Sequence, residues 1–270
     1  MPEVSVIMGI YNCADTLPYA IECILNQTFS DWELIMCDDG STDGTMSVAE
    51  GFSAVYPDKI KVIKNEKNIG LNATLNKCIK KSSGKFIARM DGDDLCVPER
   101  FEKELAELKS DSGLALVSSS MLTFDGNGVW GTITLPEYPD KRDFLAGSPF
   151  CHAACIMRKD ALESVGGYSE EERLLRVEDY HLWMKFYAAG YKGKNIAEPL
   201  YSMRDDRAAY KRRKFKYRLN EAYVRRLCVK NLRLPFYCYI YSLRPIIVGL
   251  LPERIYNMLH KRSLQGEKTE

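Results

Sequence analysis

The sequence predicts an α/β fold with a mostly parallel central sheet flanked by helices. Through the first hundred residues, short apolar runs rich in β-branched residues alternate with longer helical patterns. Each apolar run ends in a loop of polar and turn-forming residues. The chain has 270 residues with 46% hydrophobic content, which is enough to bury a complete core. Such alternation is typical of parallel strands that are connected by helices.

The elements follow one another in a regular order. The predicted strands are 4–10, 32–37, 59–64, 85–90, a pair across 114–134 with a turn at Asp125–Gly128, and 153–158. The predicted helices are 15–26, 44–55, 70–81, 98–109, and one that begins near Glu178 or Asp179 and ends by Gly190. Ligands of open α/β sheets lie outside the carboxyl ends of the strands, so the loops after the first four strands should converge.

Charge divides the chain into an acidic body and a basic end. Residues 201–270 hold 17 of the 38 Lys and Arg residues and 6 of the 37 Asp and Glu residues, which is a net charge of +11. Residues 1–200 carry −10. We therefore predict a main body over 1–203 and a helical basic and aromatic extension over 204–270.

The extension itself allows two interpretations. An apolar and aromatic run over 234–251 is interrupted by Arg244 and Pro245, so an uninterrupted transmembrane helix is not expected. The segment could lie on an anionic membrane surface, with its aromatic rings at the headgroups. It could equally be a helical hairpin packed on the main body. No nucleic-acid-binding motif accompanies the basic residues, so no specific nucleic-acid partner is expected.

Cysteine usage and the first residues indicate a cytoplasmic protein. Nine cysteines occur without a CxxC pair, and we expect reduced, buried thiols. Cys151, His152 and Cys155 lack a second pair of metal ligands. An apolar strand at 4–8 runs directly into a loop, unlike a signal peptide.

Two acidic loops carry the candidate chemistry. RMDGDDL at 89–95 puts three carboxylates into four positions, and DDGSTDGT at 38–45 follows a neighbouring strand. Clustered carboxylates need a cation, and oxygen ligands without His or Cys favour Mg²⁺ or Mn²⁺. The alternative is an acidic turn that caps the next helix, the role we expect of Asp94.

Six motifs in order resemble the family-2 inverting glycosyltransferases, which have a two-lobed, Rossmann-like nucleotide-sugar fold of the glycosyltransferase A type. They are VSVIMGIYN at 4–12, DDGSTDGT at 38–45, NEKNIGL at 65–71, RMDGDD at 89–94, GGYS at 166–169 and VEDYHLWMK at 177–185. The resemblance implies a nucleotide-sugar-binding half over 1–95 and an acceptor-binding half over 96–203.

The resemblance also assigns the donor site. Tyr11 should lie against the nucleobase, which in this family is most often uracil, and Asp39 should accept a hydrogen bond from it. Asp93 should bind Mn²⁺ or Mg²⁺, and Asp91 should approach the ribose or the water shell of the metal. The remaining donor-site residues that the motifs imply are Asn12, Asp15, Gly40, Ser41, Lys67 and Gly70.

On the acceptor side, Asp179 matches the general base of the family, and Glu178 would hold the acceptor or orient the base. A helix N-terminus at these residues would keep Asp179 ionised; taken alone, the pair reads as a helix cap. His152 and Trp183 are further candidates on this side, although each could be an ordinary core residue. Arg204 and Arg207 could close over the diphosphate.

The function that the resemblance implies is a metal-dependent, inverting transfer of a sugar from a nucleotide-diphosphate sugar to a saccharide or lipid-linked saccharide. Such a step would belong to the synthesis of a bacterial surface polysaccharide or glycan, in the cytoplasm or on the inner face of the membrane. Two alternatives remain. A sugar-phosphate nucleotidyltransferase would share the carboxylates and the metal, but GIYNCAD lacks the Gly-rich, basic loop that holds a triphosphate. A catalytically silent scaffold would bind nucleotide sugar at a membrane without turnover.

Overall fold

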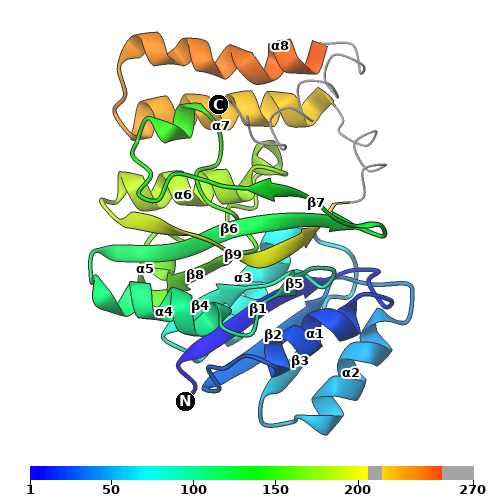
Figure 1. Cartoon of the computed structure of the whole chain (residues 1–270). Coiled ribbons are helices and arrows are strands. Elements are labelled where there is room, and N and C mark those ends of the chain that lie inside the picture. Colours follow the sequence, from blue (N-terminus) through cyan, green and yellow to red (C-terminus); the bar gives the residue numbers. More distant parts are fainter. Residues whose placement is uncertain (206–214, 251–270) are drawn as a thin grey trace.

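The structure is a computed structural model that describes residues 1–205 and 215–250. Its centre is a mixed sheet with the strand order β3-β2-β1-β4-β8-β6-β9-β5, in which β7 pairs with β6 (Figure 1). The strands are β1 (Val4–Ile10), β2 (Trp32–Asp38), β3 (Ile60–Lys64), β4 (Phe86–Arg89), β5 (Leu95–Cys96), β6 (Leu114–Asp125), β7 (Gly128–Ile133), β8 (Cys155–Arg158) and β9 (Lys192–Arg204). The predicted α/β class is confirmed.

The helices cover both faces of this sheet. They are α1 (Leu17–Leu25), α2 (Thr45–Val55), α3 (Leu71–Lys81), α4 (Arg100–Ser110), α5 (Lys159–Ser164), α6 (Glu178–Ala188), α7 (Phe215–Asn231) and α8 (Arg244–Leu250), with 3-10 turns η1 (Asp143–Leu145), η2 (Glu172–Leu174) and η4 (Phe236–Leu243). The predicted helices agree with α1 to α4 and with α6 to within about two residues, as expected for element ends.

The parallel part of the sheet is β3-β2-β1-β4. Val4 of β1 lies opposite Trp32 of β2 on one side and opposite Phe86 of β4 on the other. Every residue of β2 and of β4 is buried, as expected for strands covered by helices on both faces. The loops that follow these strands therefore emerge at one edge of the sheet, as the sequence predicts.

The second part of the sheet has mixed strand directions. Strand β8 runs antiparallel to β4 and β6, whereas β9 runs parallel to β6 and antiparallel to β5. Two of these strands, β5 and β9, were not predicted. Strand β9 reads KGKNIAEPLYSMR, and its charged residues and Pro199 interrupt the alternation that identifies a strand.

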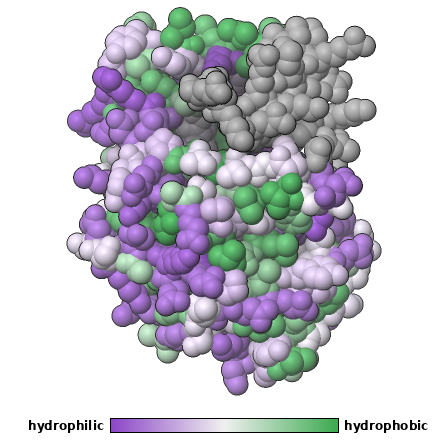
Figure 2. Space-filling model, viewed as in Figure 1, coloured by the Kyte–Doolittle hydropathy of each residue, from purple (hydrophilic) through white to green (hydrophobic). Residues whose placement is uncertain are grey.

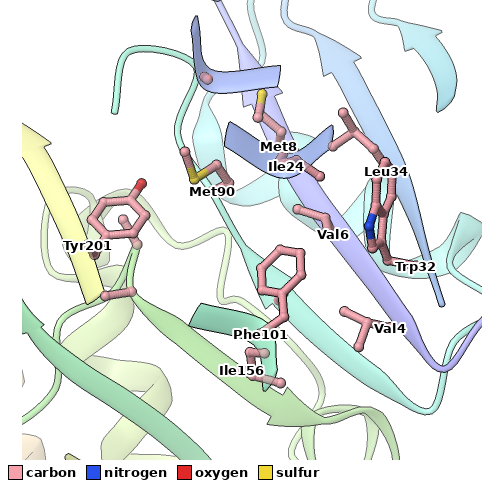
Figure 3. Packing of buried hydrophobic residues seen from close by; sticks show 14 of the residues in the cluster. Val4, Val6, Met8, Ile24, Trp32, Leu34, Met90, Phe101, Ile156 and Tyr201 are labelled. Carbon is pink, nitrogen blue, oxygen red and sulfur yellow. The ribbon is translucent and has the colours of Figure 1, made fainter. Parts of the chain in front are cut away.

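Two apolar layers enclose the sheet. Side chains of α1, α2 and α4 form one layer, and side chains of α3, α5, α6 and α7 form the other. Figure 3 shows part of the first layer, in which Phe101 of α4 lies among Val4 and Val6 of β1 and Ile156 of β8. These layers hold the strand ends in place and so position the loops of the site.

The extension begins by packing on the body. Val224 and Cys228 of α7 are buried in the second apolar layer, and the Arg225 guanidinium donates to the carbonyls of Leu145 and Ala146 at 2.5 and 2.9 Å. Of the two interpretations, hairpin packing therefore holds for α7.

Beyond α7 the chain presents apolar side chains to solvent. Figure 2 shows hydrophobic residues at the α8 end of the molecule. The exposed ones in η4 and α8 include Phe236, Tyr237, Ile240, Leu243, Ile247 and Leu250. None of the helices within the described ranges is long and apolar enough to cross a membrane. Arg207 and the rest of 206–214 and 251–270 lie outside the described residues.

Candidate active site

The first two loops are joined by their own backbone and side chains. Asn12, in the loop after β1, has a positive φ of 48°. Its backbone N–H donates to the Ser41 hydroxyl at 3.0 Å, and its side-chain oxygen accepts from the Thr42 N–H at 2.9 Å. The Cys13 N–H donates to the Thr45 hydroxyl at 2.8 Å. These bonds fix the loop that carries Tyr11 against the loop that carries Asp39.

Asp39 joins the second loop to the third. Its carboxylate accepts hydrogen bonds from the N–H groups of Ile69 and Gly70 at 2.8 and 2.9 Å, and from the Asn65 amide at 2.9 Å. Gly40 has a φ of 76°, and a Cβ atom there would lie 2.9 Å from the backbone of Lys67. Only glycine allows this approach without strain. The predicted donor residues Asp39, Gly40, Ser41, Lys67 and Gly70 thus lie in two loops in contact.

The acidic loop after β4 divides its carboxylates between two tasks. Asp91 forms a two-pronged ion pair with Arg89, with N–O distances of 2.7 and 2.9 Å. Asp94 is buried and accepts hydrogen bonds from the Tyr201 hydroxyl at 2.8 Å and the Arg204 N–H at 2.7 Å. The prediction that Asp94 caps the following helix is wrong, because its carboxylate anchors β9 instead and the cap position of α4 belongs to Glu99.

A cavity of about 360 Å³ opens between the first, second and fourth loops. Four carboxylates line it, those of Asp15, Asp43, Asp91 and Asp93, together with Tyr11, Asn12 and Arg204. Burial and the neighbouring Asp91 raise the pKa of Asp93. The cavity thus brings the predicted residues of the first and fourth loops together. Asp43 belongs to a motif that the sequence displays, but it was not singled out as a site residue.

The cavity residues suit a divalent cation. The carboxylates of Asp91 and Asp93 offer oxygen atoms of the kind that such ions prefer. Burial and the negative charge of Asp91 raise the pKa of Asp93 more than Arg204 and Arg89 lower it, so a further cation would be favourable there. Within the described ranges, no three His, Cys, Asp or Glu side chains converge as a complete metal site. Ions such as Mg²⁺ usually complete their coordination shell with phosphate oxygens and water, so two carboxylate ligands from the protein would be sufficient.

The acceptor-side acids lie on the first turn of α6, as predicted. The Ser148 hydroxyl donates to the Asp179 carboxylate at 2.9 Å. Burial raises the pKa of Asp179, and burial together with Asp179 raises the pKa of Glu178. The backbone N–H groups at the helix N-terminus lower the pKa of Asp179, as expected of this position, but burial has the larger effect on it.

His152 and Trp183 lie in the core beneath these acids. The His152 Nε2 atom is 2.8 Å from the Tyr168 hydroxyl, and burial holds the pKa of His152 well below its usual value. Trp183 is fully buried between Phe150 and Phe186. Of the two interpretations of Trp183, the core residue is therefore the one that the structure supports, since a fully buried ring offers no face to a sugar.

Arg204 reaches the cavity from the end of β9. Its Nε–H donates to the Asp93 carbonyl at 3.2 Å, and its guanidinium lies 4.7 Å from the centre of the Phe124 ring. A cation is thereby held beside the carboxylates where a diphosphate would need one.

Comparison with known proteins identifies relatives over most of the chain. A family model described as glycosyl transferase family 2 matches residues 5–166. EpsE of Bacillus subtilis is 43% identical over 267 residues, which are 99% of this chain and 96% of EpsE. The UDP-Gal:alpha-D-GlcNAc-diphosphoundecaprenol beta-1,3-galactosyltransferase of Escherichia coli is 30% identical over 274 residues, which are 98% of this chain and 97% of that enzyme.

Solved structures share the fold. The structure of S. aureus TarS 1-349 in complex with UDP-GlcNAc has a TM-score of 0.67 at 20% identity, over 92% of this chain and 71% of that one. The mannosyltransferase PcManGT of Pyrobaculum calidifontis, in complex with GDP-Man and Mn²⁺, has a TM-score of 0.60 at 18% identity, over 96% and 79% of the two chains. These likenesses support the glycosyltransferase A fold.

Proposed function

The chain belongs to glycosyl transferase family 2 and is a glycosyltransferase, and from this premise we propose a specific reaction. It transfers one sugar from a UDP-sugar to a saccharide or lipid-linked saccharide, with inversion at the anomeric carbon and with the help of Mn²⁺ or Mg²⁺. The observation that carries the proposal is the cavity in which four carboxylates and Arg204 lie at the strand ends. The names of two relatives supply the substrate classes.

The donor would occupy the loops at the strand ends. Tyr11 is 48% exposed at the cavity and offers a ring to the nucleobase. The carboxylate of Asp39 is held in a fixed orientation by three N–H donors, so it is prepared to accept one more hydrogen bond from a uracil. The galactosyltransferase relative and the TarS complex both name a UDP-sugar, which supports uridine as the base.

The diphosphate would lie between Asp93 and Arg204. Asp93, with Asp91 beside it, would hold the divalent ion, whose chemistry is to neutralise the charge that develops on the leaving diphosphate. The PcManGT complex with Mn²⁺ supports such an ion in this fold. Arg204 adds a fixed positive charge from the other wall of the cavity.

Asp179 would act as the general base. Its carboxylate takes the proton of the acceptor hydroxyl as that oxygen attacks the anomeric carbon, while the bond from that carbon to the diphosphate breaks and the nucleoside diphosphate leaves. Burial raises the pKa of Asp179, and this makes the carboxylate a stronger base than an exposed aspartate. Glu178, on the same helical turn, would bind the acceptor.

The acceptor would be reached at a membrane surface. The galactosyltransferase relative acts on a diphosphoundecaprenol-linked sugar by its name, and AmsE, 28% identical, is named for amylovoran biosynthesis. Residues 215–250 carry basic side chains beside the exposed apolar ones of η4 and α8, a combination that suits an anionic membrane. The enzyme would then work on the cytoplasmic face, in the synthesis of a surface polysaccharide.

Vesicle flotation tests the membrane surface. The protein should float with vesicles that contain phosphatidylglycerol, and Ile240→Asp should weaken this binding because it puts a charge into the apolar surface. Val129→Asp is the matched control, since Val129 is similarly exposed on β7. Equal flotation of both variants would refute the assignment of η4 and α8 as the membrane-binding surface.

Neither alternative function agrees with these observations as well as the proposed sugar transfer does. A sugar-phosphate nucleotidyltransferase is set aside by membership of a glycosyltransferase family. A silent scaffold would not need the carboxylates of Asp93 and Asp179 at positions that suit a metal and a base. Turnover of a UDP-sugar by the purified protein would exclude the scaffold.

Thermal unfolding with nucleotides tests the donor site. UDP, GDP, TDP and CDP are each added with and without Mn²⁺ to the wild type, to Asp93→Ala and to Asp58→Ala, a control on an exposed turn. A ligand at about 100 times its dissociation constant stabilises the folded state by about 2.7 kcal/mol. We expect a Mn²⁺-dependent shift with UDP that Asp93→Ala loses and Asp58→Ala keeps. A shift that both variants keep would refute the assignment of Asp93.

A further inference from the structure

Arg89 is a buried cation with an incomplete set of partners. It is the last residue of β4, and its side chain is 3% exposed. Both terminal nitrogens bind Asp91, whereas its buried Nε–H has no hydrogen-bond partner. A buried charge that is only partly paired costs free energy. This cost suggests that Arg89 serves more than the ion pair with Asp91.

A series of contacts leads from Arg89 to the acceptor side. Ala88 lies opposite Ile156 of β8, so Arg89 is next to Cys155. The Cys155 thiol donates to the His152 carbonyl at 3.0 Å. The His152 ring lies 6.0 Å from Trp183, which follows Asp179 by one helical turn on α6.

The charge of Arg89 acts on the acceptor-side acids. Burial raises the pKa of Glu178 and of Asp179, and Arg89 lowers both. It also helps to hold the pKa of His152 low, so that His152 stays neutral. Within residues 1–205 and 215–250, the Ser148 hydroxyl donates to Asp179, and the groups that interact with it electrostatically include the Glu178 carboxyl, the Cys151 and Cys155 thiols, the Tyr168 phenol and Arg89. Among these, Arg89 alone is cationic.

We propose that Arg89 is a positioning residue for both sides of the cleft. Its guanidinium holds Asp91 in place on the donor side, and its charge keeps Asp179 ionised on the acceptor side. The proposal rests on the proposed role of Asp179 as the base. Donor-side and acceptor-side chemistry are then coupled, because any change in the pairing of Asp91 alters the field that Arg89 exerts on Asp179.

Carbon-13 NMR of the aspartate carboxyl groups measures this effect without substrate. The signal of Asp179 is identified by its loss in Asp179→Asn, and its titration midpoint is compared in the wild type, Arg89→Met and Arg89→Lys. We expect Arg89→Met to raise the midpoint by about one pH unit, the low end of what a nearby opposite charge contributes. Arg89→Lys keeps the charge and should restore most of the wild-type value.

Two further variants separate charge from structural damage. Asp91→Asn removes the partner of Arg89 and leaves its charge less neutralised, so the Asp179 midpoint should fall, a change opposite in sign to that of Arg89→Met. Arg158→Lys alters another arginine, which donates to the Leu114 carbonyl at 2.7 Å at the far end of β8; it should lower the melting temperature and leave the midpoint unchanged.

The two proposals fail in different ways. An unchanged Asp179 midpoint in folded Arg89→Met, a midpoint in folded Arg89→Lys as high as that of Arg89→Met, or a rise in Asp91→Asn would overturn the role of Arg89. In that case, loss of transfer in Asp179→Asn would still support Asp179 as the base. Full transfer activity in Asp179→Asn would instead refute the base, whatever the titration shows.

Discussion

The donor side and the acceptor side of the cleft both depend on aspartates, but they treat them differently. Asp39 on the donor side accepts hydrogen bonds from two backbone N–H groups and one amide. Asp179 on the acceptor side has the Ser148 hydroxyl and a buried setting that raises its pKa. A carboxylate with several N–H donors is fixed as an acceptor, whereas a poorly solvated one readily takes a proton. This difference supports recognition as the proposed role of the donor side and proton transfer as the proposed role of the acceptor side.

The difference extends to the surrounding backbone. On the donor side, three loops bind one another directly, and Gly40 allows one of them to approach Lys67 closely. On the acceptor side, Asp179 depends on α6 and on the packing of Trp183 beneath it. Substitutions on the donor side should thus change nucleotide binding and stability. Substitutions on the acceptor side should change the transfer rate and its pH dependence.

The largest effect is expected on the acceptor side. Asp179→Asn removes the base and should lower the transfer rate by about 10² to 10⁴-fold, the usual contribution of general base catalysis. The Mn²⁺-dependent thermal shift with UDP should remain, because the donor loops are untouched. A rate close to the wild type, measured by release of UDP, would show that the two sides do not divide their tasks in this way.

A smaller effect is expected on the donor side. Gly40→Ala puts a side chain at a φ of 76° and 2.9 Å from the Lys67 backbone, and should lower the free energy of unfolding by about 2 kcal/mol. It should also weaken the UDP-dependent shift. Gly126→Ala is the control, because no atom lies within 4 Å of its added Cβ; its effect should stay within about 0.5 kcal/mol. Equal denaturation midpoints for the two variants would contradict the close approach of the second and third loops.

The smallest effect concerns pH. The pKa of Asp179 is raised in the folded protein, so its contribution to stability is complete below the pKa of the unfolded chain and is lost as pH rises through the folded value. Asp179→Asn cannot ionise, and it should therefore melt at a higher temperature than the wild type at pH 7. The difference should shrink as pH falls towards 4. A lower melting temperature of Asp179→Asn at pH 7 would mean that the ionised carboxylate of Asp179 does not destabilise the folded state.

The sequence by itself determined the first half of the fold and most of the donor loops. Strands β1 to β4 and the helices between them follow from local hydrophobic periodicity, and the resemblance of the loop motifs to family 2 adds Asp39, Gly40 and Gly70 as donor-site residues. These signals are local, because the residues that form each element stand next to one another in the chain.

Only the tertiary structure decided the partners and the electrostatics. Strand β9, which lacks a clear periodic pattern, supplies Tyr201 and Arg204 to Asp94 from more than 100 positions away. Trp183 lies in the core, and burial, which no motif records, raises the pKa of Asp179. The physical reason is that the state of a charged group depends on every neighbour that replaces its water, and those neighbours come from distant parts of the chain.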